Sequence, residues 1–178
     1  AAGRFTPGPG ARYTEAIAHL RALLAHYGLR EEGDPVDGSG RRATVSVRTL
    51  ARRAAAGEGP PTDRLLRERS LRLGLVNLGN MHRLEKRFDA ALDCLGAALY
   101  CDPDYVEAYA ERAWVHLDRA DPEAAEADIR RALERQVGTP EQKARVLVGY
   151  AEALERVGLV GEQGRWLEEA RRLAPTSP

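Results

Sequence analysis

The side chains in this sequence that could do chemistry are its histidines, cysteines and carboxylates. His82 and His116 are 34 residues apart, and Cys94 and Cys101 are seven residues apart. Zinc sites are usually identified from pairs of cysteines or histidines only a few residues apart, and the sequence contains no such pair. We therefore predict no metal site and no cofactor, and we expect both histidines to pack inside the protein.

The two cysteines fall on one predicted helix. A rise of about 1.5 Å per residue separates them by about 10 Å, which is too far for a disulfide bond. Free cysteines are typical of a reducing compartment, so the expected location is cytoplasmic.

The carboxylates give no enzyme signature. The sequence has no nucleophile elbow, no phosphate-binding glycine loop and no arrangement of cysteine and histidine typical of covalent catalysis. Asp34 and Asp37 lie in a loop that could suggest calcium, but the alternating acids and the closing glutamate of a calcium loop are missing. We therefore predict that the protein is not an enzyme.

Charge is balanced overall but unevenly distributed. Residues 1–87 carry 16 basic and 9 acidic side chains, a net charge of +7, whereas residues 88–178 carry 11 and 18, a net charge of −7. Of the 27 basic residues only Lys86 and Lys143 are lysines, which we attribute to a GC-rich, bacterial-like genome.

A run of arginines in the first half could follow the phosphates of a nucleic acid. Its members are Arg41, Arg42, Arg48, Arg52, Arg53, Arg64, Arg67, Arg69 and Arg72. The run has no interleaved aromatic residues, and Glu58, Asp63 and Glu68 interrupt it. A solvated face, or a face that docks on an acidic partner, is therefore favoured over nucleic acid.

Helical periodicity dominates the chain, and no alternating run is long enough for a strand. Residues 1–10 are rich in glycine and proline and are expected to be flexible. Apolar stripes predict a first helix over 13–27 that ends at Gly28, a short helix over 46–56 and a long helix from 62 to about 84. No apolar run is long enough to span a bilayer, so no membrane partner is expected.

From residue 72 onward the sequence repeats itself. Three first helices share a small residue at one position, Gly79, Ala113 and Ala151, with steps of 34 and 38 residues between them. The second helices have small residues at equivalent places, namely Ala91, Ala98, Ala125, Ala132 and Ala170. Helices spaced at the short end of about 8–10 Å need small side chains where they cross, so we expect these positions to pack each pair together.

This pattern resembles the tetratricopeptide repeat, a helix–turn–helix unit of about 34 residues. The matching units are 72–105, 106–139 and 144–177, and the first closes on Pro103 as the family pattern does. The resemblance implies an all-α fold in which three repeats over 72–178 form a right-handed superhelical stack. Helices and loops in 11–71 would pack on the repeats.

In this family the first helices of the repeats line a concave groove that binds proteins or peptides. The resemblance assigns to that groove Val76, Asn80, Arg83, Glu107, Ala110, Trp114, Leu117, Asp118, Arg145, Val148, Glu152, Glu155 and Arg156. Some members grip the C-terminal carboxylate of heat-shock chaperones, and Asn80 matches one asparagine of that clamp, but the basic residues of the clamp are not matched. The acids in the groove favour a basic, neutral or apolar segment instead. Trp114 is the strongest candidate for contact with a partner, and packing between repeats is the alternative interpretation.

We therefore predict a non-catalytic interaction module that binds a protein or peptide in this groove. Two alternatives stay open. The arginine-rich first half could bind nucleic acid or an acidic partner. The last repeat has no capping helix after Pro175, so it could self-associate through Trp166 and Leu167.

Overall fold

The computed structural model describes residues 9–31, 45–61, 66, 68–135 and 139–175, with the backbone alone for residues 9–13. These residues form an all-α fold, as predicted, apart from two strands of two residues each. The helices are α1 (Pro9–His26), α2 (Val47–Ala55), α3 (Arg69–Leu84), α4 (Phe88–Cys101), α5 (Val106–Asp118), α6 (Pro122–Glu134), α7 (Pro140–Arg156) and α8 (Val160–Leu173). The strands are β1 (Leu29–Arg30) and β2 (Val45–Ser46).

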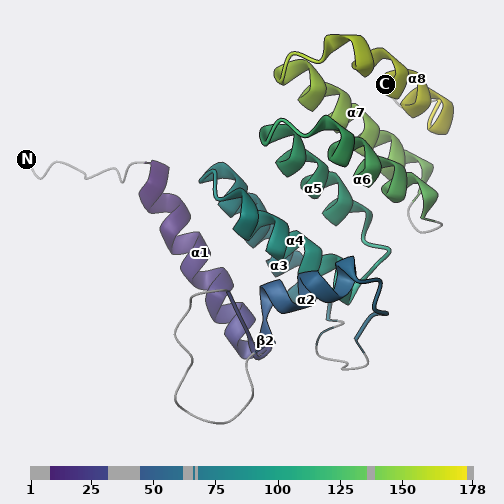
Figure 1. Cartoon of the computed structure of the whole chain (residues 1–178). Helices are drawn as coiled ribbons and strands as arrows, with labels where there is room; N and C mark the ends of the chain where they lie inside the picture. The colour runs from purple at the N-terminus through teal and green to yellow at the C-terminus, as the bar shows by residue number, and fades with distance from the viewer. Residues whose placement is uncertain (1–8, 32–44, 62–65, 67, 136–138, 176–178) are drawn as a thin grey trace, which may run out of the picture.

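The helices from α3 onward form three hairpins that stack in sequence order (Figure 1). α3 packs against α4, α5 against α6 and α7 against α8, while α5 contacts both α3 and α7. Each hairpin turns through a residue with positive φ at an equivalent place: Lys86 (60°), Ala120 (59°) and Gly158 (84°). The backbone therefore repeats the same turn even where the residue is not the glycine that such a φ favours.

The first helices of the second and third hairpins differ in how they begin. α7 starts at Pro140, one turn before the repeat unit that begins at residue 144. Thr139 caps it by accepting a hydrogen bond from the Gln142 amide, and the Gln142 side chain accepts one from the Thr139 amide in return. This reciprocal pair satisfies two amides at the helix start, which explains why α7 is longer than α5.

The eight small residues at the predicted helix crossings are all buried, namely Gly79, Ala91, Ala98, Ala113, Ala125, Ala132, Ala151 and Ala170. The approach is very close at Gly79, where a Cβ atom would lie 2.9 Å from Leu95 Cγ and 3.3 Å from the Ala91 carbonyl oxygen. A side chain has no room there, which accounts for a glycine inside α3 despite a helix-propensity cost of about 1 kcal/mol.

The N-terminal helices pack directly on the first hairpin. α1 lies against α3 and α2 against α4 (Figure 1). Both approaches use a glycine of the hairpin: a Cβ at Gly74 would lie 2.5 Å from Leu23 Cδ2, and one at Gly96 would lie 2.8 Å from Ala51 Cβ. Ile17, Leu24, Val47 and Leu50 join the same buried cluster as the core of α3 and α4. The N-terminal helices and the first hairpin therefore share one core.

Two helix starts differ from the prediction. α1 begins at Pro9, inside the segment that the sequence indicates as flexible. α3 begins at Arg69 and not near 62, because Glu68 before it is extended (φ −65°, ψ 135°). Residues 62–65 and 67 lie outside the described residues.

The structure also contains a short parallel pairing of β1 with β2, which the sequence does not predict. Leu29 pairs with Val45 and Arg30 with Ser46. Two residues are too few to produce a detectable alternation, so periodicity cannot reveal such a bridge. Ser46, one of the two residues (with Thr44) that the sequence offers as a cap, also caps α2 by accepting a hydrogen bond from the Thr49 amide.

Among the described residues, none of the helices combines the length and the apolarity that a membrane span needs.

Candidate functional site

The face formed by the first helices α3, α5 and α7, here called the inner face, is centred on Trp114. This side chain projects from α5 and is half-buried. The Arg83 guanidinium on α3 lies 5.2 Å from the centroid of the Trp114 ring, and the Arg156 guanidinium on α7 lies 5.0 Å from it. Cations at such distances are attracted by the negative face of the ring, so Trp114 connects all three helices.

A cavity of about 350 Å³ lies beside Trp114, between α5 and α7. Its lining includes four residues that the sequence assigns to the groove, namely Glu107, Ala110, Trp114 and Arg145. Gly149 forms part of the opposite wall, and a Cβ there would lie 3.6 Å from the Trp114 ring. Because Gly149 has no side chain, it does not cover the face of the indole that borders the cavity.

Glu111, which is not among the groove residues that the family resemblance assigns, also lines the cavity. Its Oε2 atom is buried and has no hydrogen-bond partner among the described residues. Burial raises the pKa of Glu111, and the positive charge of Arg83 opposes that rise. A carboxylate oxygen without a partner at a cavity wall can accept a hydrogen bond from a cationic or N–H group of a ligand.

In a second part of the inner face, the polar side chains form hydrogen bonds with one another. Arg83 donates hydrogen bonds to Asn80 Oδ1 at 3.3 and 3.1 Å and to Asp118 at 2.8 Å. The Asn80 oxygen is therefore already engaged. Farther along α7, Val148, Glu152 and Glu155 are exposed.

Two residues assigned to the groove are not on its surface. Val76 is 7% exposed and Leu117 is 3% exposed, and each belongs to a buried apolar cluster. This differs from the assignment by family position: both side chains support the inner face from beneath and do not form it.

Of the arginine run of the first half, the structure describes Arg48, Arg52, Arg53, Arg69 and Arg72, and three of these five pair with a carboxylate. Arg48 pairs with Asp93 at 2.8 Å, Arg53 with Glu58 at 3.7 Å, and Arg72 with Asp102. Arg41, Arg42, Arg64 and Arg67 lie outside the described residues. Arginines whose charge is matched by a carboxylate are less available to phosphates, which weakens the nucleic-acid alternative.

The last hairpin covers its own tryptophan. Trp166 is 5% exposed. Its ring contacts Tyr150 edge to face at a centroid distance of 5.5 Å, and the Arg165 guanidinium lies 4.6 Å from the ring centroid. Trp166 therefore does not supply the uncovered apolar surface on which the self-association alternative depends.

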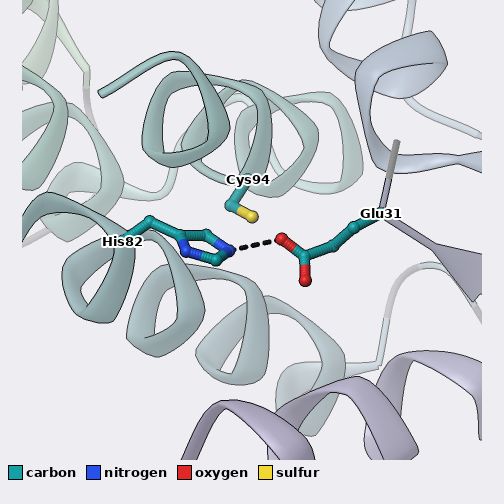
Figure 2. A group of neighbouring side chains, drawn as sticks. All are labelled: Glu31, His82 and Cys94. Carbon is teal, nitrogen blue, oxygen red and sulfur yellow. Dashed lines mark hydrogen bonds and ion pairs between the residues drawn. The ribbon is translucent and has the colours of Figure 1, made fainter. Parts of the chain in front are cut away.

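A separate cluster of three polar side chains lies in the core of the first hairpin, here called the buried cluster: Glu31, His82 and Cys94. Their exposed fractions are 6%, 0% and 1%. His82 Nε2 donates to Glu31 Oε1, and the Cys94 thiol points toward the gap between imidazole and carboxylate (Figure 2). One ligand-forming atom from each residue lies within 4.8 Å of the other two.

The electrostatics of the buried cluster centre on Glu31. Burial by itself raises the pKa of this carboxyl, but hydrogen bonds from His82 and Arg21, together with their charges, outweigh burial and hold the pKa below its ordinary value. Burial and the nearby charges of Glu31 and Asp93 raise the pKa of Cys94 well above its usual range. The cluster therefore combines an ionised carboxylate with a protonated thiol.

Sequence spacing could not reveal the buried cluster. Glu31 and His82 are 51 residues apart, and His82 and Cys94 lie on different helices of the hairpin. The sequence pairs His82 with His116 by repeat position and predicts no metal site, whereas the fold pairs His82 with Glu31 and Cys94. Cys94 and Cys101 are both free and buried.

Comparisons with known proteins add little to these contacts. No protein-family model matches the sequence, and no curated protein matches it. Among solved structures, the crystal structure of MamA is similar over 93% of this chain and 91% of that chain, with 19% sequence identity and a TM-score of 0.46. A likeness at this level identifies neither a family nor a function.

Proposed function

We propose that this chain is a non-catalytic interaction module that binds a peptide or protein segment on the inner face, with Trp114 as the central contact. The observation that carries the proposal is that Trp114 and Glu111 line one cavity between α5 and α7, and that the buried Oε2 of Glu111 has no hydrogen-bond partner among the described residues. Tryptophan is enriched among the residues that dominate binding energies, and a hot spot is usually surrounded by contacts that exclude water.

The partner we infer is a segment with a basic side chain next to an apolar one. The basic side chain would supply the donor that Glu111 Oε2 lacks, and Glu107, which is exposed at the same cavity, adds a second negative charge. The apolar side chain would pack on the indole. Arg145 at the opposite wall discriminates against a segment with basic residues throughout.

A fluorescence experiment tests this proposal, because the chain has only two tryptophans. In Trp166→Phe, all indole emission comes from Trp114. Peptides selected from a random displayed library on the wild-type chain are expected to contain the basic and apolar pair and to shift this emission. Trp114→Ala should weaken their binding by about 2 kcal/mol or more, the range of hot-spot residues.

A second variant separates recognition of charge from contact with the indole. Glu111→Gln keeps the shape of the side chain and removes its charge, so selected basic peptides should bind more weakly while matched peptides with a neutral residue are little affected. The proposal fails if the selection yields no binding peptides. It also fails if binding is the same in Trp114→Ala as in Trp166→Phe, because the tryptophan buried in the last hairpin serves as the control.

Salt dependence distinguishes the nucleic-acid alternative. Binding to phosphates falls steeply between low and moderate salt because counterions are released, whereas contacts to the indole are largely independent of salt. A partner bound through Trp114 should therefore stay bound as the salt concentration rises.

A further inference from the structure

We propose that Glu31, His82 and Cys94 form a binding site for a zinc-class divalent cation, independent of the inner face. The three side chains come from the residue that follows β1, from α3 and from α4, and the fold brings their ligand-forming atoms to within 4.8 Å of one another. A thiolate sulfur, an imidazole nitrogen and a carboxylate oxygen are the three ligand types that zinc takes in proteins.

The charges of the set suit a buried divalent ion. A thiolate and a carboxylate contribute two negative charges, which cancel the two positive charges of the cation, and the neutral imidazole completes the set. Each ligand-forming atom is withdrawn from bulk water. A hard cation such as Mg²⁺ prefers oxygen ligands, so the sulfur and nitrogen favour zinc and similar transition metals.

Binding replaces protons that the cluster now holds. The Cys94 thiol loses its proton to solvent as the metal–sulfur bond forms. His82 Nε2, which now donates to Glu31 Oε1, must lose its proton to solvent while Nδ1 carries the one remaining ring proton, so that a neutral imidazole presents the Nε2 lone pair to the ion. The carboxylate then bonds to the cation through the oxygen that previously accepted from His82.

Neighbouring groups are placed to orient two of the ligands. Arg21 donates to Glu31 Oε2, while Oε1 is the oxygen that faces the His82 ring and that would meet the ion. His82 Nδ1 is buried and has no hydrogen-bond partner within the part of the chain that the structure describes, and the Oε2 atom of Glu85 lies 3.9 Å from it. A histidine that binds metal usually donates its other ring N–H to a carboxylate, and a small movement of Glu85 would provide that contact.

A cavity of about 470 Å³ gives the cluster access to the surface. Glu31 and Cys94 are part of its lining, and Arg87 and Asp89 at its outer part are exposed. The cavity provides an entry path for the ion. It also provides room for a water molecule in the fourth position, which three protein ligands leave open.

Cobalt(II) is the direct probe, because a thiolate bound to it produces an intense charge-transfer absorption band. The full chain, stripped with a chelator, is titrated with Co²⁺ and then with Zn²⁺, which should displace the cobalt. We expect one cation per chain and the thiolate band. Cys94→Ala should abolish the band and weaken zinc binding by more than about 100-fold, since even partners outside the ligand shell account for about 10- to 100-fold.

The chain contains a matched control for each ligand. Cys101 is the other buried cysteine of α4, and His116 occupies the place of His82 in the second hairpin. Cys101→Ala and His116→Gln should therefore keep the band, while His82→Gln should lose it. The proposal is overturned if the wild-type chain gives no thiolate band, or if Cys94→Ala and Cys101→Ala behave alike.

X-ray absorption at the zinc edge decides the question without any variant, should Cys94→Ala or His82→Gln fail to fold. One sulfur scatterer together with nitrogen and oxygen scatterers supports the site. A shell of oxygen alone would show that zinc binds elsewhere on the surface and would overturn the proposal.

Discussion

The first and second hairpins carry buried polar side chains at equivalent positions, but these side chains find their partners in different ways. His82 and His116 are at equivalent positions on α3 and α5, and Cys94 and Asp128 are at equivalent positions on α4 and α6. In the second hairpin Arg112 of α5 donates two hydrogen bonds to Asp128, at 2.7 and 2.6 Å, and His116 lies 3.7 Å from the same carboxylate. The polar groups there are paired within the hairpin.

The first hairpin has Leu78 where the second has Arg112, so it has no cation of its own at this place. The carboxylate that meets His82 is Glu31, which comes from outside the hairpin and is itself held by Arg21 of α1. In the third hairpin the equivalent residues are Leu154 and Trp166, and both are buried. One backbone pattern therefore accommodates a self-paired site, a site completed by a neighbouring segment and an apolar site.

The largest effect is expected from breaking the self-paired site. Asp128→Ala leaves the Arg112 guanidinium, whose side chain is 18% exposed, without its carboxylate. Removing one partner of a buried ion pair costs about 3–5 kcal/mol, and chemical denaturation should show a loss of that size. The double variant Arg112→Leu/Asp128→Cys copies the first hairpin at these two positions. It should be more stable than Asp128→Ala, and an equally unstable double variant would argue against the comparison.

A smaller loss is expected from the site completed by Glu31. Glu31→Gln removes the charge that accepts from His82 and Arg21, and hydrogen bonds to charged groups are worth about 1.5–3 kcal/mol. The pKa of Glu31 is held below its ordinary value of 4.5 in the folded chain, because its partners outweigh burial. The unfolded chain therefore binds more protons near this pH, so the contribution is present above pH 4.5 and is lost as the pH falls through the folded pKa.

Denaturation of wild type and Glu31→Gln across pH, in the presence of a chelator, measures this contribution. The stability difference between them should shrink below pH 4.5. A difference that stays constant with pH would mean that Glu31 contributes through packing alone.

A loss of stability of similar size is expected at the crossing of the two helices in the first hairpin. Gly79 of the first hairpin and Ala113 of the second occupy the same place, but a Cβ at Gly79 would lie 2.9 Å from Leu95 Cγ. Gly79→Leu should destabilise by about 1–3 kcal/mol through overpacking, as measured by thermal unfolding. Gly149→Ala is the control, because a Cβ there makes only ordinary contact with Trp114.

The smallest effect is expected at His116. Burial lowers its pKa from the ordinary value of 6.5, and Arg112 and Arg119 act in the same direction, against Asp128 and Asp121. The unfolded chain then binds more protons just below pH 6.5, so His116 contributes stability above that pH and loses it as the pH falls. His116→Gln should flatten the stability profile below pH 6.5, and an unchanged profile would contradict this.

The sequence was informative wherever a signal is local and repeated. The hairpins and the small residues of the crossings follow from periodicity and spacing. The start of α3 was predicted wrongly because helix-compatible residues continue upstream of Arg69, and only the extended backbone of Glu68 ends the pattern.

The polar sites were beyond the reach of sequence because they depend on contacts between distant segments. Glu111 is one of many acids on a helix, and only the position of α7 makes it part of a cavity wall. Glu31 precedes a segment outside the described residues, and nothing near it in the sequence indicates His82 as its partner. The sequence singles out Trp114 by its residue type, but its contacts with Arg83 and Arg156 depend on the stacking of all three hairpins.

The docking of α1 and α2 on the first hairpin has a practical consequence for anyone who trims this chain. A fragment that starts at residue 72 would match the repeat boundary, yet it would strip the cover from Gly74 and Gly96 and remove the carboxylate opposite His82. Its newly bared apolar surface would favour aggregation. The shortest well-behaved version of the protein should therefore retain everything from α1 onward.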